Sequence, residues 1–332
     1  MFKLKSQNSK RKAKIQNFKF YILVFTFAFC VLNFGLLVGC QNKPVYRETQ
    51  VLMGTFVEVL SPSPDAPSVA FTEIKRIENL MSKYNPHSEI SKLNQLGSLK
   101  ASPDTYYILK KAAEFWRLSD GAFDITVGPL LDIWGFTSKQ YRIPTKEKIK
   151  NALSLVGFDK IIFNDTDNTV KFKVRGMKID LGGIAKGYAV DCAIKKLKEK
   201  GISSCLINAG GQIYCLGDNF GKPWNVAIKN PRGNGVVDYL KLKNQAVSTS
   251  GDYEQYFIKA KHRYSHIFNP KTGYPADSDL ACVTVVAQDG LTSDALSTSI
   301  FILGKTGEQD FAKRFPGVKI IVFEKKNVPD NQ

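Results

Sequence analysis

The amino-acid sequence predicts an α+β fold with mixed or antiparallel sheets and packed helices. Two observations favour this class. After a helix expected at residues 183–200 the chain becomes rich in strands, and helices and strands do not alternate regularly as they do in a parallel α/β fold. The 332 residues also show no internal repeat and no evident domain linker, although they could form one large domain or two small ones.

Residues 1–39 have the order of a secretory signal: a basic segment without acids, a long apolar run, and a small residue at the end. The closing Leu37-Val38-Gly39-Cys40 resembles a bacterial lipobox, in which Cys40 is lipidated and becomes the first residue. The alternative is a plain transmembrane anchor, because the apolar run is just long enough to span a bilayer. Since an anchor does not explain the cysteine, we expect a lipoprotein signal peptide, a membrane tether over residues 40–48, and a lipid-anchored protein on the periplasmic or extracytoplasmic side.

The composition argues against a nucleic-acid partner and a histidine-rich metal site, and it indicates the state of the cysteines. Removing the leader lowers the formal net charge from +17 to +10, and the remaining cations form no dense arginine block with aromatic residues, so we expect no nucleic-acid partner. The three histidines are too few for a histidine-rich metal site. Beyond Cys40, four cysteines lie in apolar runs and are expected to be buried free thiols, with a Cys205–Cys215 disulfide as the alternative. They are Cys192, Cys205, Cys215 and Cys282.

Local patterns predict the elements before residue 180. Residues 51–60 have the composition of a strand that contains Met53-Gly54-Thr55. A hairpin is expected from residues 161–163 and 169–174, which flank a polar turn. Helical spacing, N-cap residues and terminal breakers predict three helices, at residues 68–83, 102–118 and 145–157.

The remaining elements are mostly strands. One helix is expected at 183–200, where Gly201 ends it, and another at 294–303 before Gly304. Runs of β-branched and aromatic residues predict seven strands, at residues 204–207, 224–229, 236–242, 246–249, 256–260, 282–287 and 319–323.

The segment IDLGGIAKGYAVD, residues 179–191, places an acid, three glycines and a lysine at a strand-to-helix turn. Free backbone N–H groups and the helix dipole favour phosphate at such a helix start, and Lys186 adds a positive charge. The spacing matches neither the P-loop nor the dinucleotide-binding glycine pattern. A tight turn that uses the glycines only for backbone geometry is the alternative.

Two further segments carry candidate chemistry. In residues 292–304 we expect Thr292 or Ser293 to cap a helix that begins near Asp294, so that Asp294 and Thr298 lie on one face. A carboxylate beside a hydroxyl suits Mg²⁺, whereas ordinary capping and surface polarity are the alternative. His266 lies among turn residues and prolines in residues 264–276, where a functional role is more common than on an apolar helix face.

Seven ordered blocks resemble the FAD:protein FMN transferase (ApbE) family, and the similarity covers residues 48–325. The blocks are Met53-Gly54-Thr55, Ala122-Phe123-Asp124, IDLGGIAKGYAVD, NAGGQIY, STSGDYEQY, SHIFNPKTG and SDALST. The resemblance implies an ApbE-like fold, related to the T-fold, with one catalytic unit over residues 49–326. It also implies a bacterial enzyme that is anchored to the membrane.

The family's activity, carried over by this resemblance, is the Mg²⁺-dependent transfer of FMN from FAD to a Thr or Ser hydroxyl of a target flavoprotein, with release of AMP. The resemblance assigns Asp294, Thr298 and the carbonyl of Gly183 to the metal. It gives His266 the role of base or positioning group near the acceptor hydroxyl. It assigns eight residues to the FAD site: Met53, Tyr84, Ala122, Phe123, Asp124, Asp180, Lys186 and Phe268.

Three other functions fit parts of the sequence. A Mg²⁺-dependent FAD pyrophosphatase would share the donor cleavage and use water as the acceptor. A flavin-binding lipoprotein would bind the cofactor without catalysis. A generic substrate-binding lipoprotein would need two α/β lobes, which the strand-rich second half disfavours.

Overall fold

The structure is a computed structural model that describes residues 44–325, so the predicted signal peptide, Cys40 and the following residues 41–43 of the tether lie outside the described residues. The first strand, β1 (Tyr46–Leu52), already belongs to the main sheet, and the expected tether therefore overlaps the folded unit at residues 46–48. Between residues 44 and 325 no helix combines the length and apolar character needed to cross a membrane.

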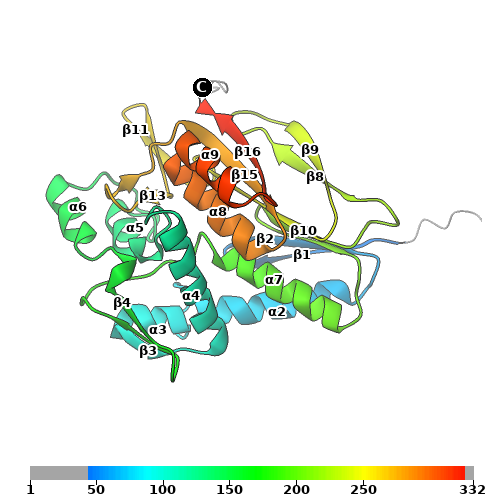
Figure 1. Cartoon of the computed structure of the whole chain (residues 1–332), viewed down its shortest axis with the longest axis horizontal. Helices are drawn as coiled ribbons and strands as arrows, with labels where there is room; N and C mark the ends of the chain where they lie inside the picture. Colours follow the sequence, from blue (N-terminus) through cyan, green and yellow to red (C-terminus); the bar gives the residue numbers. More distant parts are fainter. Residues whose placement is uncertain (1–43, 326–332) are drawn as a thin grey trace, which may run out of the picture. The chain divides into compact units, whose positions relative to one another are not determined.

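A seven-stranded antiparallel sheet forms the centre of the described chain (Figure 1). Its order is β1-β2-β6-β7-β10-β15-β16, which joins the N-terminal hairpin to strands from the C-terminal third. This single sheet confirms the α+β prediction and is not the two-lobed α/β arrangement of a substrate-binding lipoprotein. After β1, its strands are β2 (Thr55–Ser61), β6 (Cys205–Ala209), β7 (Gln212–Leu216), β10 (Gln245–Gly251), β15 (Leu280–Ala287) and β16 (Lys319–Glu324).

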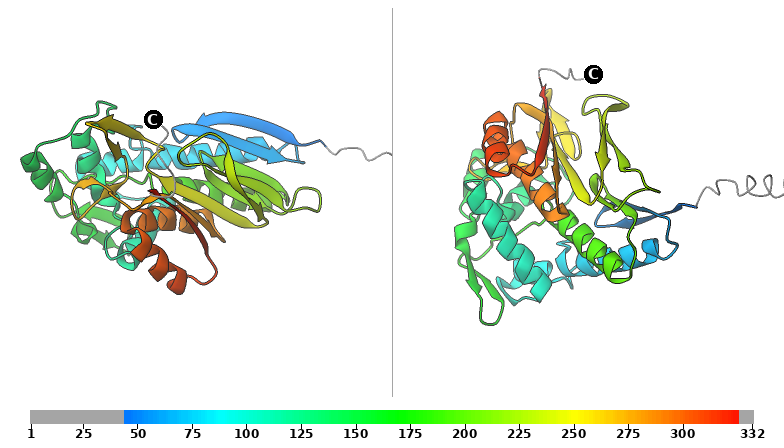
Figure 2. Two further views of the ribbon diagram at one scale, coloured as in Figure 1. Left: turned by 90° about the horizontal axis from the view of Figure 1, so that it is seen from above. Right: turned by 45° about the vertical axis from the view of Figure 1, so that its right-hand side comes forward.

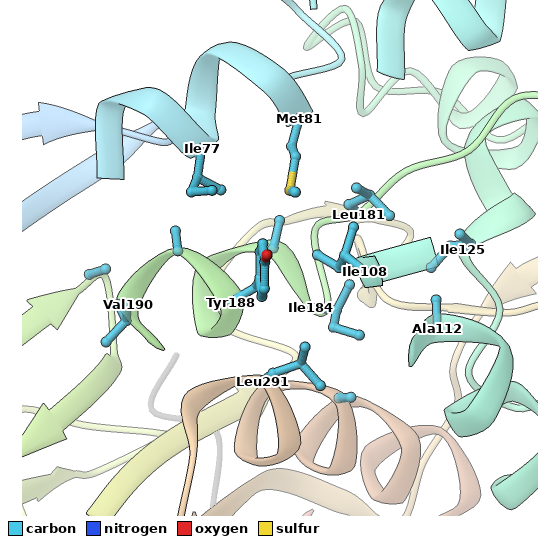
Figure 3. Packing of buried hydrophobic residues seen from close by; sticks show 14 of the residues in the cluster. Ile77, Met81, Ile108, Ala112, Ile125, Leu181, Ile184, Tyr188, Val190 and Leu291 are labelled. Atoms are coloured by element: carbon cyan, nitrogen blue, oxygen red, sulfur yellow. The ribbon is translucent and has the colours of Figure 1, made fainter. Parts of the chain in front are cut away.

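Three helices cover one face of this sheet: α2 (Ala66–Met81), α7 (Ala185–Glu199) and α8 (Gly290–Leu303). Figure 3 shows α7 in the middle, where Ile184 and Tyr188 lie between Ile77 and Met81 of α2 and Leu291 of α8. These side chains are all buried, so the helix layer shares one hydrophobic core with the sheet. This layer fixes the start of α7 relative to α8.

The opposite face of the sheet is covered by a two-stranded hairpin, β8 (Trp224–Lys229) and β9 (Val236–Leu242), which is separated from the helices in Figure 2. Every second residue of β8 is buried, and these residues pack on Leu206, Cys215 and Val247 of the sheet. This alternation explains why the sequence predicts β8 with its observed bounds.

A second region, drawn mainly from residues 89–172, packs beside the helix layer. Its helices are α3 (Glu89–Leu96), α4 (Pro103–Leu118), α5 (Gly128–Trp134), α6 (Lys146–Leu153) and the short η1 (Ile125–Val127) and η2 (Phe158–Lys160). Its sheet has the order β3 (Ser98–Lys100), β5 (Thr169–Phe172), β4 (Ile161–Asn164). The remaining elements are the hairpins β11 (Tyr256–Lys259) with β12 (His262–Ser265) and β13 (Phe268–Asn269) with β14 (Tyr274–Pro275), and the helix α9 (Lys305–Arg314).

Several local predictions were wrong in informative ways. The single strand expected at residues 51–60 is the β1–β2 hairpin, because Met53 and Gly54 both have positive φ (52° and 74°) and form a tight turn. Helix α6 ends at Leu153, four residues before the expected glycine. Helix α8 begins at Gly290, and its cap is Asp289, whose side chain accepts a hydrogen bond from the Thr292 N–H.

The four cysteines of the described chain are free thiols, as expected, although Cys192 is only half-buried. The alternative Cys205–Cys215 disulfide is wrong. Cys205 pairs across the β6–β7 ladder with Leu216, and Cys215 pairs with Leu206. Cys205 therefore faces the helix layer and Cys215 faces the β8–β9 hairpin, on opposite sides of the sheet.

Candidate functional site

The turn before α7 is built around Asp180. The Asp180 carboxylate accepts a hydrogen bond from the Gly182 N–H (2.7 Å) and forms an ion pair with Lys83. The backbone N–H of Asp180 donates to the carbonyl of Ile125 (2.7 Å), and this bond anchors the turn to η1. Burial alone raises the pKa of Asp180, but the Lys83 ammonium and the Gly182 N–H outweigh burial and hold the pKa below its usual range. The carboxylate is therefore ionised at neutral pH.

This turn is less open to an anion than the sequence indicates. The Gly182 N–H is bonded to Asp180, the Ala185 N–H to the carbonyl of Leu181 (2.8 Å), and the Gly187 N–H to Asp294 Oδ2 (3.0 Å). Three of the backbone donors expected to receive phosphate are thus taken by the protein. The positive charge at this place comes from side chains instead.

Lys186 and Asp294 form the charged centre of the site. The Lys186 Nζ donates to the carbonyl of Gly182 (3.0 Å) and lies 3.6 Å from Asp294 Oδ1. Asp294 is 3% exposed, and Oδ1 also accepts a hydrogen bond from the Ser248 hydroxyl (3.3 Å). A buried carboxylate with a cation and two donors around it is electrostatically compensated.

The Gly183 backbone lies close to the Thr298 hydroxyl. A methyl group at Gly183 would lie 3.1 Å from Thr298 Oγ1 and 3.2 Å from the Phe123 ring, so the backbone here is close to both. The Thr298 hydroxyl lies 3.2 Å from the Ser250 hydroxyl, which in turn lies 2.9 Å from that of Ser297. Asp294 and Thr298 are four residues apart on α8, as predicted, although the helix begins earlier.

This donor set fits a hard divalent cation. A carboxylate, hydroxyl groups and a backbone carbonyl are the ligands that Mg²⁺ prefers, and Mg²⁺ usually takes its other ligands from water and substrate phosphates. In the part of the chain that the structure describes, no group of three or more His, Cys, Asp or Glu side chains is placed to hold a metal. A cation at Asp294 would therefore take ligands other than further carboxylate, imidazole or thiolate groups, such as water and substrate phosphates.

His266 is half-buried at the end of β12 and is held by the loop after β10. Its backbone N–H donates to the carbonyl of Gln255 (3.0 Å), and its Nδ1 lies 3.1 Å from the same oxygen. Burial lowers the pKa of His266 to about 4, and the nearby ammonium groups of Lys186 and Lys83 lower it as well. The ring is therefore neutral at pH 7, and a proton on Nδ1 leaves Nε2 as an acceptor.

The loop that holds His266 is fixed by a buried ion pair. Arg232, from the β8–β9 turn, binds both oxygens of Asp252 (2.6 and 2.7 Å), and the two side chains are 5% and 8% exposed. Arg263 approaches the same carboxylate (3.3 Å). Because Asp252 lies three residues before Gln255, this ion pair ties the support of His266 to the β8–β9 hairpin.

The other residues predicted to line the FAD site differ in their exposure and in their contacts. Ala122 and Phe123 are buried, and Phe123 reaches Gly183. Tyr84 is 67% exposed, with the Lys83 Nζ 5.0 Å from its ring, so it is on the Asp180 side of the site. Met53 lies in the β1–β2 turn, where its N–H donates to Glu78 of α2 (2.7 Å).

Two of the predicted FAD-site side chains are engaged within the protein. The Asp124 carboxylate accepts hydrogen bonds from the Thr126 N–H (2.8 Å), the Thr126 hydroxyl (2.6 Å) and the Phe158 N–H (3.1 Å), and burial raises its pKa. The Phe268 ring packs edge-on against Trp134 and Phe136 (5.9 and 5.7 Å between centroids).

Sequence analysis missed several residues that the structure adds. Lys83 follows α2 with no motif around it. Ser248 and Ser250 alternate on β10 and both face α8, and period-two spacing in the STSGDYEQY block could have paired them. Asn94 holds both polar groups of the Ile179 backbone (2.7 and 2.9 Å), and only the three-dimensional fold reveals this contact.

The chain is similar in sequence and in structure to proteins of one family. A model of the ApbE family matches residues 53–322. The FAD:protein FMN transferase of Haemophilus influenzae is 34% identical over 253 residues, 73% of each chain, and that of Treponema pallidum is 31% identical over 327 residues, 90% of each chain. The structure also resembles the crystal structure of the ApbE protein from Thermotoga maritima, with a TM-score of 0.80 and 37% identity over 85% of this chain and 95% of that one. The flavin transferase ApbE from Vibrio cholerae has a TM-score of 0.76 and 27% identity over 86% and 96%.

Proposed function

This chain belongs to the ApbE family, and we propose that it is an FAD:protein FMN transferase, which moves the FMN part of FAD to a hydroxyl group of an acceptor protein. The observation that carries the proposal is the convergence of Lys186, Asp294, Thr298 and the Gly183 backbone beside a neutral histidine. These groups match the two needs of the reaction, which are charge compensation at a diphosphate and proton removal from an alcohol.

The diphosphate end of the site rests on fixed charges. The ammonium of Lys186 is held by the Gly182 carbonyl close to Asp294, so it is oriented before any phosphate arrives. We propose that Asp294, Thr298 and the Gly183 carbonyl hold Mg²⁺, which when bound would compensate the negative charge of the diphosphate. The Lys83–Asp180 ion pair keeps the turn before α7 in one conformation.

The acceptor end rests on His266. With Nδ1 directed at the Gln255 carbonyl, Nε2 can accept the proton of a Thr or Ser hydroxyl. The hydroxyl oxygen then forms a bond to the phosphorus of the FMN part, while the bond from this phosphorus to the bridging oxygen breaks. AMP leaves with the electrons of that bond, and the proton remains on His266 until AMP or solvent takes it.

The location of the protein is also part of the proposal. We propose that Cys40 is lipidated and that residues 41–45 connect the anchor to β1, which would hold the enzyme at the outer face of the cell membrane, close to a membrane or secreted flavoprotein as acceptor. Support comes from the leader sequence and from the start of the sheet at Tyr46.

One experiment separates this function from its alternatives. The purified protein is incubated with FAD, MgCl₂ and an acceptor flavoprotein, and intact mass and AMP are measured together. We expect the acceptor to gain one FMN group per AMP released, and EDTA to abolish both. AMP release with an unmodified acceptor would instead indicate a pyrophosphatase, and FAD binding without AMP would indicate a flavin-binding lipoprotein.

A further inference from the structure

Helices α7 and α8 touch through their backbones near the site. A methyl group at Gly187 would lie 2.2 Å from the carbonyl oxygen of Gly290, and one at Gly290 would lie 2.6 Å from the carbonyl oxygen of Gly187. Neither position can take a side chain unless the helices separate. Figure 3 labels the neighbours of the two glycines in the sequence, Tyr188 of α7 and Leu291 of α8, and shows α7 lying above the part of α8 that carries Leu291.

A carboxylate from each helix binds the start of the other. Asp191 of α7 accepts hydrogen bonds from the N–H groups of Gly290 (2.6 Å) and Leu291 (2.8 Å) on α8. Asp294 of α8 accepts one from the Gly187 N–H on α7 (3.0 Å). These bonds flank the glycine contact on both sides, so they restrain both the distance and the rotation between the helices.

Asp289 caps α8 from within the chain leading into it, through the Thr292 N–H (2.7 Å) and hydroxyl (3.0 Å), whereas Asp191 binds the Gly290 and Leu291 N–H groups from another helix. The bonds of Asp191 therefore link two helices, which those of Asp289 do not. Burial, together with the neighbouring carboxylates of Asp289 and Asp294, raises the pKa of Asp191 to about 7 against the effect of the two N–H donors. Tyr214 of β7 also lies within electrostatic range of this carboxylate. An ionised Asp191 is thus costly for stability, and this cost favours a role other than stability.

We propose that Asp191 is a positioning residue that sets the separation between the Gly183–Lys186 turn and the Asp294–Thr298 face, and so the geometry available to a cation and a diphosphate. Asp191 lies more than one helical turn beyond Lys186 and acts through the α8 backbone. The inference rests on the proposed function and deepens it, because it concerns the same cation site.

The variant Asp191→Asn tests this role, and Asp289→Ala is the matched control. Each carboxylate oxygen of Asp191 accepts from one N–H group, so in Asp191→Asn one oxygen becomes an amide donor that faces an N–H donor, which loosens the link between the helices. Asp289→Ala removes a cap from the same helix end without touching α7. The readout is FAD binding, measured by the quenching of flavin fluorescence in titrations with and without MgCl₂.

For Asp191→Asn we expect the Mg²⁺ concentration at half-maximal FAD binding to rise about tenfold or more, since changes behind metal ligands typically cost about 10–100-fold in affinity. FAD binding without metal should change less than about threefold, and the Tm at pH 8 should stay within about 3 °C, because a charge that is costly to bury is removed. Asp289→Ala should lower the Tm and leave the Mg²⁺ requirement unchanged.

The inference is overturned if Asp191→Asn lowers the Tm but binds Mg²⁺ like the wild type, or if both variants shift the Mg²⁺ requirement equally. Should Asp191→Asn fail to fold, Asp191→Glu retains the carboxylate but displaces it by one methylene, and it must still weaken Mg²⁺ binding. Failure of the proposed function is distinguishable, because it appears in the wild type itself. AMP release without modification of the acceptor would overturn the transferase but leave this test of the cation site intact, whereas wild-type FAD binding that does not respond to Mg²⁺ would overturn the inference as well.

Discussion

Replacing His266 with alanine is expected to slow FMN transfer to the acceptor by about 10²–10⁴-fold, which is the usual contribution of a positioned general base. This range corresponds to about 2.7–5.4 kcal/mol of transition-state free energy at 1.36 kcal/mol per factor of ten. FAD affinity should change only a few-fold, because the polar contacts of the ring are with the Gln255 carbonyl and not with the residues around Asp294.

Because the pKa of His266 is about 4, the role of His266 as a base also predicts how the transfer rate depends on pH. At pH 5.5 an ordinary histidine, with a pKa near 6.5, is about nine-tenths protonated, whereas His266 stays almost entirely neutral. Protonation of His266 should therefore not lower the transfer rate between pH 7 and pH 5. The rate should instead decrease as the pH falls through about 4.

His266 also makes the stability of the fold depend on pH. Because folding lowers the pKa of His266, its contribution is fully present above pH 6.5 and is lost as the pH falls through about 4. The difference from 6.5 corresponds to about 3 kcal/mol, and solvent screening of the half-buried ring reduces it to about 2 kcal/mol. His266→Ala should lack this part of the acid-induced loss of stability.

The assay follows the intact mass of the acceptor over time at saturating FAD, and flavin fluorescence gives the affinity. An acid limb near pH 6.5 that persists in Asp191→Asn would refute the argument, as would an alanine variant of His266 that transfers FMN within threefold of the wild-type rate. An alanine variant that still releases AMP without modifying the acceptor would show that His266 serves the acceptor and not donor cleavage.

Three further predictions concern the support of the site, each measured by urea unfolding at pH 7. Gly187→Ala should destabilise the fold by about 3 kcal/mol, because its methyl group would lie 2.2 Å from a backbone oxygen of α8; wild-type stability would contradict the close contact. Lys83→Met should cost about 2–3 kcal/mol by leaving Asp180 unpaired. Since folding lowers the pKa of Asp180, this loss should shrink as the pH falls below 4, and a loss that is independent of pH would argue against the ion pair. Arg232→Met should cost about 2 kcal/mol, because a second arginine remains 3.3 Å from Asp252, and an unchanged midpoint would mean that the ion pair contributes nothing.

The fold was predictable where one face of an element is buried and the other is not. Strand β8 alternates between buried and exposed residues, and α4 has a serine cap, a proline start and one apolar face. Helix α8 lacks such contrast, because nearly all of its residues are buried. Its true start at Gly290 is set by capping from Asp289 and by contact with α7, and hydrophobic periodicity carries neither signal.

The candidate site was predictable to the extent that its residues lie in motifs. Asp180, Gly183, Lys186, Asp294 and Thr298 come from two short segments, and the fold brings these segments together. The supporting residues could not be found in this way. Lys83 lies almost a hundred residues before its partner, and a lone lysine after a helix is usually an exposed one.

The internal spacing of IDLGGIAKGYAVD follows from this arrangement. Gly187 and Asp191 are four residues apart and lie along one side of α7, and Gly183 stands four residues before Gly187 in the turn that leads into the helix. All three approach α8, although Gly183 also meets Phe123. Gly183 approaches Thr298, Gly187 contacts the α8 backbone, and Asp191 binds the start of α8. Phosphate-binding glycine loops space their glycines to expose backbone N–H groups, whereas the Gly187 N–H here is bonded to Asp294. Gly183 and Gly187 therefore serve contact with α8, and under the proposed function recognition of the diphosphate would fall to Lys186 and to a cation at Asp294.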